Sequence, residues 1–334
     1  MQKVKIAVVG LGWVAQIFHL PILTKMEDVE VVALCDKDKS RAKFIAEKFG
    51  VNRWYSDYQE MLKVEDIDAV DICTSTDAHL PVSVAAFQAG KDVFIEKPIA
   101  RFYDEAMKIC DAAKESKRKL MVGMNNRFRP DAMILKSFIE GGELGKIFYI
   151  KAGWLKKLTA DRGWLTKKEK AGGGVFLDLG IVLLDLSLWM LGFPTVQRVS
   201  ARMFSHETKN VEDTCLGFYE TTQGVTTFFE SSWSFQAEQD FFYCKIYGSE
   251  GSAQLNPLQI NKKLHGSLVN VTPAKVETPH NLYKKSYENE LKHFVGALHG
   301  FHQIISTGEE AVQRMRIVDA LYKSSDKRKE VTIK

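Results

Sequence analysis

Two glycines near the start of the chain have a spacing that can hold a dinucleotide. The segment Gly10-Leu11-Gly12-Trp13-Val14-Ala15 has the pattern G-x-G-x-x-A and directly follows an apolar run at residues 5–9. In such a motif the first glycine permits a tight turn, the second lets the backbone approach a pyrophosphate, and the small last residue allows close helix–strand packing. A helix N-terminus then offers free N–H groups to the phosphates. The spacing therefore predicts a dinucleotide-binding turn.

An acidic residue follows at the place where a ribose-binding carboxylate is expected. Asp36 ends the second apolar run, Ala33-Leu34-Cys35-Asp36. A carboxylate there accepts hydrogen bonds from a ribose 2′-hydroxyl and repels a 2′-phosphate, which favours NAD over NADP. Lys37 adds a charge that could tolerate a phosphate, so NADP stays open as an alternative. A helix-capping role for Asp36 is the other interpretation, although Asp38 or Ser40 could fill it.

The elements that must position these residues alternate regularly over the first 123 residues. Short, nearly continuous apolar runs at 5–9, 29–34, 69–73, 92–95 and 120–122 are typical of strands buried on both faces. Amphipathic segments at 13–26, 38–49, 78–89 and 102–117 lie between them and predict helices. This alternation predicts βαβ units in a doubly wound parallel sheet, a Rossmann domain over residues 1–123.

The pattern changes after Gly123. Helices are expected near 130–139, 176–191, 284–300 and 308–324, and strand-like segments dominate from Thr195 to Val276 without a long helix between them. Strands joined by turns predict an antiparallel sheet. We therefore expect an α+β domain with a large, mostly antiparallel open sheet over residues 124–334, for substrate binding and oligomerisation.

Composition restricts the kind of partner. The 334 residues carry 46 Lys+Arg and 42 Asp+Glu, a formal net charge of only +4, which lacks the basic bias of a nucleic-acid binder. Five scattered cysteines favour a reducing cytoplasm and argue against a disulfide framework or a zinc site. We expect no membrane helix, because no apolar stretch approaches the roughly 18 residues that such a helix needs. We expect a cytoplasmic protein that binds neither nucleic acid nor membrane, and no metal.

Further motifs resemble the Gfo/Idh/MocA oxidoreductases, the family of glucose–fructose oxidoreductase and inositol dehydrogenase. The resemblance covers nearly the whole chain, with every motif in family order. Besides the glycine turn it includes Thr74-Ser75-Thr76-Asp77-Ala78-His79, Glu96-Lys97-Pro98, Asn126-Arg127-Phe128, Arg162-Gly163-Trp164, the run Gly172 to Gly180 and Glu212-Asp213-Thr214. It implies a Rossmann domain plus an α/β domain with a large open sheet, as the periodicity indicates independently.

The resemblance also implies site residues. Lys97 matches the active-site lysine beside the nicotinamide and the substrate hydroxyl, where an ammonium stabilises a developing alkoxide and can relay its proton. Pro98 makes Lys97-Pro98 a candidate cis bond, which would aim the lysine in a fixed direction. Asp178 matches the aspartate that contacts substrate hydroxyls; a helix N-terminal acid is the compatible structural interpretation. His79 is expected near the cofactor, or as a cap of the following helix.

One position departs from the family pattern. Four residues after the aspartate most members carry a histidine and some a tyrosine, but this chain has Val182. On a helix Asp178, Val182 and Asp185 share a face. Valine cannot transfer a proton, so the usual general base is missing.

Three hypotheses follow. Lys97 does the acid–base work alone, at a cost of about 10²–10⁴-fold in rate. Alternatively, another group from residues 155–170 or from the sheet replaces the histidine. In the third, the protein is a catalytically weak or inactive NAD(P)-binding ligand sensor or partner subunit. The first is preferred: an NAD(P)-dependent dehydrogenase acting on CH–OH groups of a sugar, cyclitol or related polyol.

The complete set of expected site residues has three parts. Lys97 and Asp178 are expected to be catalytic. The expected cofactor-binding residues are Gly10, Gly12, Trp13, Val14, Asp36, Lys37, Thr74, Ser75, Thr76, His79, Glu96 and Lys97. The expected substrate-binding residues are Arg127, Arg162, Trp164 and Asp178. A homodimer or homotetramer is expected by analogy with the family.

Overall fold

The computed structural model describes residues 2–63, 66–157, 163–274 and 279–333. The chain forms two compact units. Unit 1 contains Met1–Met124 and Tyr287–Val312, and unit 2 contains Asn125–Ser286 and Gln313–Lys334. Two long helices, α9 (Pro279–Leu298) and α10 (Gly308–Lys327), contribute residues to both units. The domain division after residue 123 stays a prediction.

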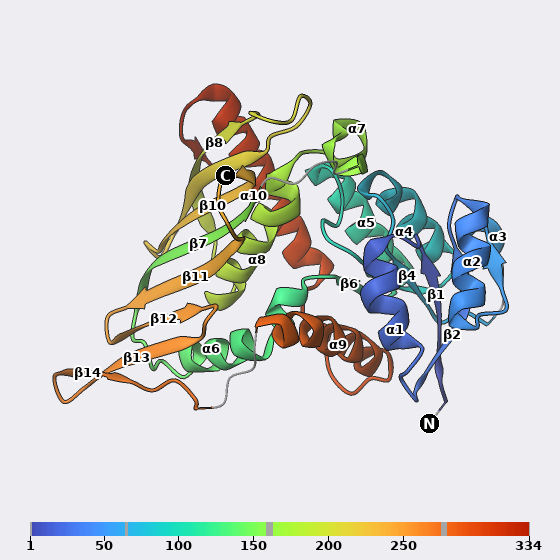
Figure 1. The fold of residues 1–334 in the computed structure, drawn as a ribbon, viewed down its shortest axis with the longest axis horizontal. Coiled ribbons are helices and arrows are strands. Elements are labelled where there is room, and N and C mark those ends of the chain that lie inside the picture. The colour runs from blue at the N-terminus through green and yellow to red at the C-terminus, as the bar shows by residue number, and fades with distance from the viewer. Residues whose placement is uncertain (1, 64–65, 158–162, 275–278, 334) are drawn as a thin grey trace. The chain divides into compact units, whose positions relative to one another are not determined.

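Unit 1 is built on a six-stranded parallel sheet (Figure 1). Its order is β3 (Trp54–Tyr55), β2 (Val29–Cys35), β1 (Val4–Val9), β4 (Ala69–Ile72), β5 (Asp92–Ile95) and β6 (Leu120–Val122). The predicted strands are confirmed: nearly continuous apolar runs such as β4, which is buried throughout, are typical of strands that lie between two layers of helices. Only β3 was not predicted, and its two residues are half-buried.

The helices of unit 1 follow the strands. They are α1 (Leu20–Leu23), α2 (Lys39–Phe49), α3 (Tyr58–Met61), α4 (His79–Gln88) and α5 (Tyr103–Ser116). The Asp38 carboxylate caps α2 by accepting the N–H groups of Ser40 and Arg41, each at 3.1 Å. Asp38 thus performs the capping role that was the alternative for Asp36. A π-helical turn, η1 (Ala15–His19), comes between the glycine motif and α1.

Unit 2 is built on a nine-stranded sheet. Its order is β14 (Ser267–Asn270), β13 (Gln259–Leu264), β12 (Gly251–Leu255), β11 (Phe241–Gly248), β7 (Ile147–Lys157), β10 (Thr226–Phe235), β9 (Thr214–Thr221), β8 (Val196–Phe204) and β15 (Val331–Thr332). The β7–β10 pair is parallel and the other pairs are antiparallel. The predicted fold class, a Rossmann sheet plus a mostly antiparallel open sheet, is confirmed.

Helices cover one face of this sheet. α8 (Ile181–Met190) packs on β7 and β10, and it follows a second π-helical turn, η5 (Phe176–Gly180). Figure 1 shows α8 and α10 along the same face. Ser324 and Ser325 of α10 accept backbone N–H groups of β8, at 3.1 Å each. α6 (Pro130–Glu140) packs near β12.

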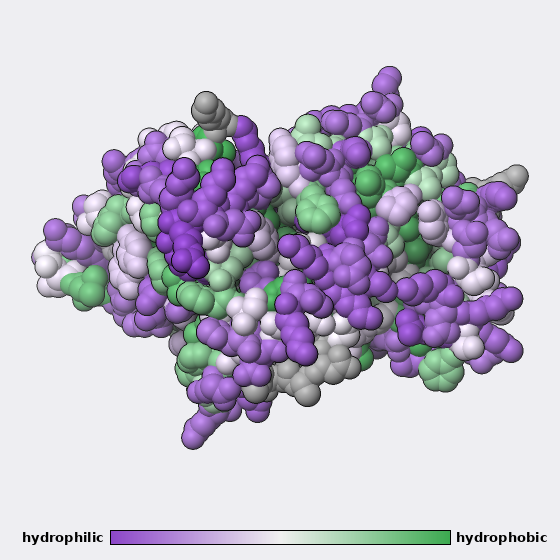
Figure 2. All heavy atoms as spheres, turned by 90° about the horizontal axis from the view of Figure 1, so that it is seen from above, coloured by the Kyte–Doolittle hydropathy of each residue, from purple (hydrophilic) through white to green (hydrophobic). Residues whose placement is uncertain are grey.

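The segment Lys168–Met190, which includes α7 (Lys168–Ala171), corrects one expectation. It is 23 residues long and, by length and composition alone, apolar enough to cross a membrane. However, 94% of its most apolar window is buried inside the protein, so the segment serves as core. In contrast, the face seen in Figure 2 is mostly hydrophilic with small apolar areas.

Candidate functional site

The glycine motif forms a tight turn at the carboxyl end of β1. Gly10 has φ of +89°, and a Cβ atom there would lie 2.6 Å from the carbonyl carbon of Cys73 and from the nitrogen of Thr74. Only glycine therefore fits this position. A Cβ at Gly12, by contrast, would meet nothing within 4 Å. The chain next to Gly12 is thus open to a close-approaching group.

Asp36 lies at the end of β2 and is buried. Its carboxylate accepts the N–H of Leu11 and the N–H of Asp38, both at 2.9 Å, and Arg41 lies 3.4 Å away. The Leu11 bond ties the acid to the glycine turn. A carboxylate has about four acceptor sites, so capacity is left for a hydroxyl. Lys37, next to it, is exposed.

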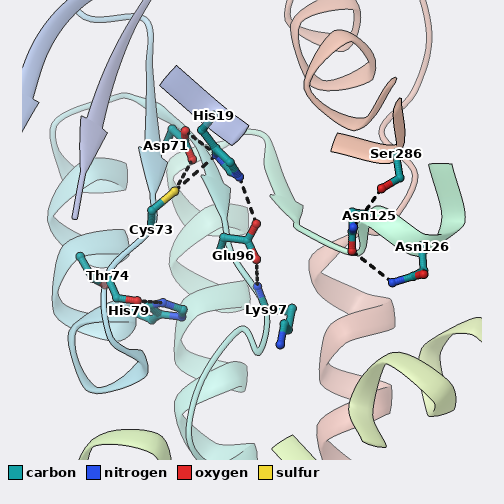
Figure 3. Close-up of polar contacts among 10 residues, drawn as sticks. All are labelled: His19, Asp71, Cys73, Thr74, His79, Glu96, Lys97, Asn125, Asn126 and Ser286. Atoms are coloured by element: carbon teal, nitrogen blue, oxygen red, sulfur yellow. Dashed lines mark hydrogen bonds and ion pairs between the residues drawn. The ribbon is translucent and has the colours of Figure 1, made fainter. Parts of the chain in front are cut away.

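The turn after β4 carries Thr74, Ser75 and Thr76, of which only Thr76 is buried. His79 follows this turn and is the first residue of α4. Its Nδ1 lies 2.9 Å from the carbonyl oxygen of Pro98. Its Nε2 lies 3.3 Å from the carbonyl oxygen of Thr74 (Figure 3). Burial lowers the pKa of His79, so the ring stays neutral. A neutral ring has a single N–H and donates to only one of these two oxygens, of which that of Pro98 is nearer. His79 thus connects the turns after β4 and β5.

The Glu96-Lys97-Pro98 turn follows β5 directly. The Lys97–Pro98 peptide bond is cis, as predicted. Lys97 is half-buried, and its backbone N–H donates to Glu96 Oε2 at 3.1 Å. Because β1, β4 and β5 are neighbours in a parallel sheet, the turns that follow them meet at one edge of it.

These residues fit a dinucleotide. The open side of Gly12 suits a pyrophosphate, the helical start at η1 suits its charge, and Asp36 suits a ribose hydroxyl. Trp13, which is 63% exposed, and the half-buried Val14 follow Gly12 directly in the chain.

In unit 2, Asp178 lies half-buried within η5. Its Oδ2 accepts the indole N–H of Trp233 at 3.0 Å. Buried Glu212 supports the preceding glycine run, since its Oε1 accepts the N–H groups of Gly174 and Phe176 at 2.9 and 3.1 Å. Tyr322 also donates to that oxygen, at 2.7 Å. A π-helical turn at this point is a frequent mark of a functional site.

The remaining predicted residues of unit 2 have different surroundings. Val182 is buried near the start of α8. Arg127 is fully buried, and its guanidinium donates to both carboxylate oxygens of Asp185, at 2.8 and 2.6 Å. Arg127 thus stabilises α8, and its contact with a substrate stays a prediction. Trp164 is half-buried, and Arg162 lies outside the described residues.

Sequence reasoning missed His19, at the end of η1. Its Nδ1 lies 2.8 Å from Asp71 Oδ2 and its Nε2 lies 3.1 Å from Glu96 Oε1 (Figure 3). The ligand-type atoms of His19, Asp71 and Cys73 all lie within 4.8 Å of one another. Desolvation, followed by the nearby Asp71, raises the pKa of the Cys73 thiol and keeps it protonated. Because metal ligation requires a thiolate, hydrogen bonding explains why His19, Asp71 and Cys73 lie together. A histidine in an apolar helix offers no signal for this role.

The fold and the site define a class: a dinucleotide-binding Rossmann unit joined to an α/β sheet domain. Comparison with family models agrees. Residues 4–124 match the oxidoreductase family, NAD-binding Rossmann fold, and residues 136–333 match the oxidoreductase family, C-terminal alpha/beta domain. The chain belongs to the Gfo/Idh/MocA oxidoreductase family.

Individual relatives are similar over most of their length. The chain is 29% identical to D-glucoside 3-dehydrogenase of Escherichia coli (strain K12), over 96% of this chain and 95% of that protein. It is 29% identical to scyllo-inositol 2-dehydrogenase (NAD(+)) of Bacillus subtilis (strain 168), over 77% and 75%. Among solved structures, levoglucosan dehydrogenase in complex with NADH and levoglucosan shares the fold, with a TM-score of 0.90 at 21% identity over 99% of this chain and 100% of that one.

Proposed function

We propose that this chain is an NAD-dependent dehydrogenase that interconverts a hydroxyl and a keto carbon of a sugar, cyclitol or related polyol. The observation that carries the proposal is the arrangement in unit 1. The glycine turn, Asp36 and the Lys97 turn all follow strands of one parallel sheet and lie at its carboxyl edge. The relatives that act on a glucoside and an inositol support this substrate class.

Bound NAD supplies the nicotinamide ring as the two-electron acceptor. The residues of the chain must then orient the substrate and handle one proton. Lys97 Nζ is the group we assign to the substrate hydroxyl, where its charge stabilises the developing alkoxide and its nitrogen exchanges the proton. The Glu96 carboxylate and the His79 ring hold the backbone on both sides of this lysine.

We assign Asp178 of unit 2 to the substrate hydroxyls. One of its oxygens accepts the Trp233 indole N–H, which fixes the direction of the carboxylate. A carboxylate has about four acceptor sites, so Asp178 can accept from a polyol in addition to Trp233. Trp164 and Arg162 remain our proposals for further substrate contacts.

Val182 favours a second candidate, a binding protein without turnover. An apolar, buried side chain stands where a proton-transferring histidine would be expected from the family pattern. The chain would then bind cofactor and sugar as a sensor or partner subunit.

One set of measurements separates the two candidates. NADH binding is measured by fluorescence titration, and turnover is measured with NAD on a panel of methyl glucosides, inositols and levoglucosan. We expect micromolar NADH binding, and turnover that Lys97→Ala abolishes while Lys108→Ala, an exposed lysine of α5, does not. NADH binding without turnover on the whole panel would favour the sensor. An absence of binding at millimolar NADH would reject both.

Three broader features belong to the same proposal. We propose a cytoplasmic location and a homodimer or homotetramer. We also propose that residues 1–123 bind the cofactor and that residues 124–334 bind the substrate.

A further inference from the structure

A buried polar cluster lies behind the Lys97 turn of unit 1. It joins three elements: His19 comes from η1, Asp71 from β4, and Glu96 from the residue after β5. Their exposed fractions are 0%, 1% and 8%. Burying charged groups this deeply is unfavourable unless they are paired, so the pairing within the cluster must be close to complete.

The histidine is bonded on both sides. One ring nitrogen lies 2.8 Å from Asp71 and the other 3.1 Å from Glu96, as Figure 3 shows. Two carboxylate acceptors require two N–H donors, which only an imidazolium provides. Burial, the largest influence, lowers the pKa of His19, but the Asp71 carboxylate outweighs it and holds the pKa well above its usual value. The ring is therefore charged at neutral pH.

The second oxygen of Glu96 reaches the catalytic turn. It accepts the backbone N–H of Lys97 at 3.1 Å. A chain of contacts thus runs from Asp71 through His19 and Glu96 to the backbone of Lys97. Because His19 ends the helical turn that starts after the glycine motif, the same ring connects the cofactor turn to the lysine turn.

Aromatic rings enclose the histidine. The ring of Phe94 lies edge-on to that of His19, with 5.6 Å between the ring centroids, and the ring centroid of Tyr287 lies 5.8 Å from that of His19. Glu290 of α9 is also fully buried, and burial together with Glu96 raises the pKa of its carboxyl well above the usual value. A neutral Glu290 adds no third negative charge to the Asp71 and Glu96 carboxylates that flank His19.

We propose that His19 is a positioning residue, which holds Glu96 against the backbone of Lys97 and thereby sets the direction of the lysine. The inference rests on the proposed function for its catalytic consequence. Its structural part can be tested without turnover.

The first test is hydrogen exchange at the Lys97 amide in the cofactor-free protein. Pro98 has no amide hydrogen, so a short peptide ending there reports mainly on the lysine. His19→Gln removes the charge and one of the two bonds. We expect Lys97 to exchange about tenfold faster or more, with other amides of β5 unchanged. Ser83→Ala is the control, because Ser83 is equally buried in α4 and its hydroxyl has no partner among the described residues. It should change nothing.

The second test is the pH dependence of kcat. We expect His19→Gln to lower kcat by about 10- to 100-fold at every pH, with KM and NADH affinity within about threefold, as for a misplaced catalytic group. Asp71→Asn keeps an acceptor for the ring but removes the charge that holds its proton. Its kcat should therefore acquire a new fall as the pH rises through neutrality, which a merely structural role would not produce.

Three outcomes of the exchange experiment and of metal analysis overturn the proposal. They are an unchanged Lys97 amide in His19→Gln, faster exchange throughout β5, and stoichiometric metal in the purified protein that His19→Gln loses. A wild-type pH profile in Asp71→Asn would also contradict it. If the wild-type protein turns over no sugar, the proposed function fails, while the exchange experiment still decides the role of His19.

Discussion

The two glycines of the cofactor turn should respond to the same substitution in opposite ways. Alanine at Gly10 must adopt φ of +89° and place its Cβ 2.6 Å from two backbone atoms of residues 73 and 74. Alanine at Gly12 meets no atom within 4 Å. One added methyl group therefore tests stability at one position and cofactor approach at the other.

The magnitudes follow from these contacts. A left-handed alanine costs about 1–2 kcal/mol, and forcing backbone atoms apart costs about 1–3 kcal/mol more. We expect Gly10→Ala to lower the free energy of unfolding by about 2–5 kcal/mol. Gly12→Ala should leave it within about 1 kcal/mol of wild type, since the loss of glycine entropy in the unfolded chain helps slightly. Its methyl group, however, occupies the space for the pyrophosphate, and NADH affinity should fall at least about tenfold, or 1.4 kcal/mol.

Urea denaturation and NADH fluorescence titration measure the two quantities on the same samples. Wild-type stability in Gly10→Ala would refute the steric argument. NADH affinity equal to wild type in Gly12→Ala would refute the assignment of this turn to the cofactor, because a pyrophosphate bound there must meet the added methyl group.

Three further predictions concern both units. If the missing general base limits turnover, Val182→His should raise kcat by up to about 10²-fold. It should also lower the free energy of unfolding by about 1–3 kcal/mol, because a polar ring enters an apolar site. Steady-state kinetics and denaturation measure the two effects, and an unchanged kcat would show that a histidine at position 182 does not act as the base. Trp233→Phe removes the indole N–H that donates to Asp178, a hydrogen bond worth about 1.5–3 kcal/mol because its acceptor is charged. The KM for substrate should therefore rise while NADH affinity stays the same. Equal losses of substrate and NADH affinity would contradict the assignment of Asp178 to the substrate. The pH dependence of stability should report His19, whose pKa is raised in the folded state: its contribution is fully present below the unfolded value of about 6.5 and is lost as the pH rises toward the raised value. Denaturation at increasing pH should show this loss in wild type and a flatter curve in His19→Gln, and parallel curves would count against a charged His19.

Much of unit 1 could be predicted because its signals are local. Strands buried on both faces must be continuously apolar, and the glycine spacing reflects contacts within a single turn. The two-residue strand β3 escaped prediction because two half-buried residues have no periodicity. The apolar segment that includes α8 was recognised as a helix, although its length relative to a membrane span was underestimated.

The candidate site likewise has a part that local motifs predict and a part that depends on contacts between distant residues. Gly10, Gly12, Asp36, Lys97 and Asp178 were predicted from motifs whose residues are near one another in the chain. Partnerships across long separations were not predicted, since no local pattern encodes them. The bond between His19 and Glu96 spans 77 residues.

The sequence by itself determined the alternation of strands and helices, the dinucleotide turn and the family, because each depends on residue types at short spacing. Only the tertiary structure decided which turns meet and which polar groups pair. The order β1-β4-β5 brings three turns to one edge, and burial then forces His19, Asp71 and Glu96 to satisfy one another. That requirement, and not any motif, places a charged ring behind Lys97.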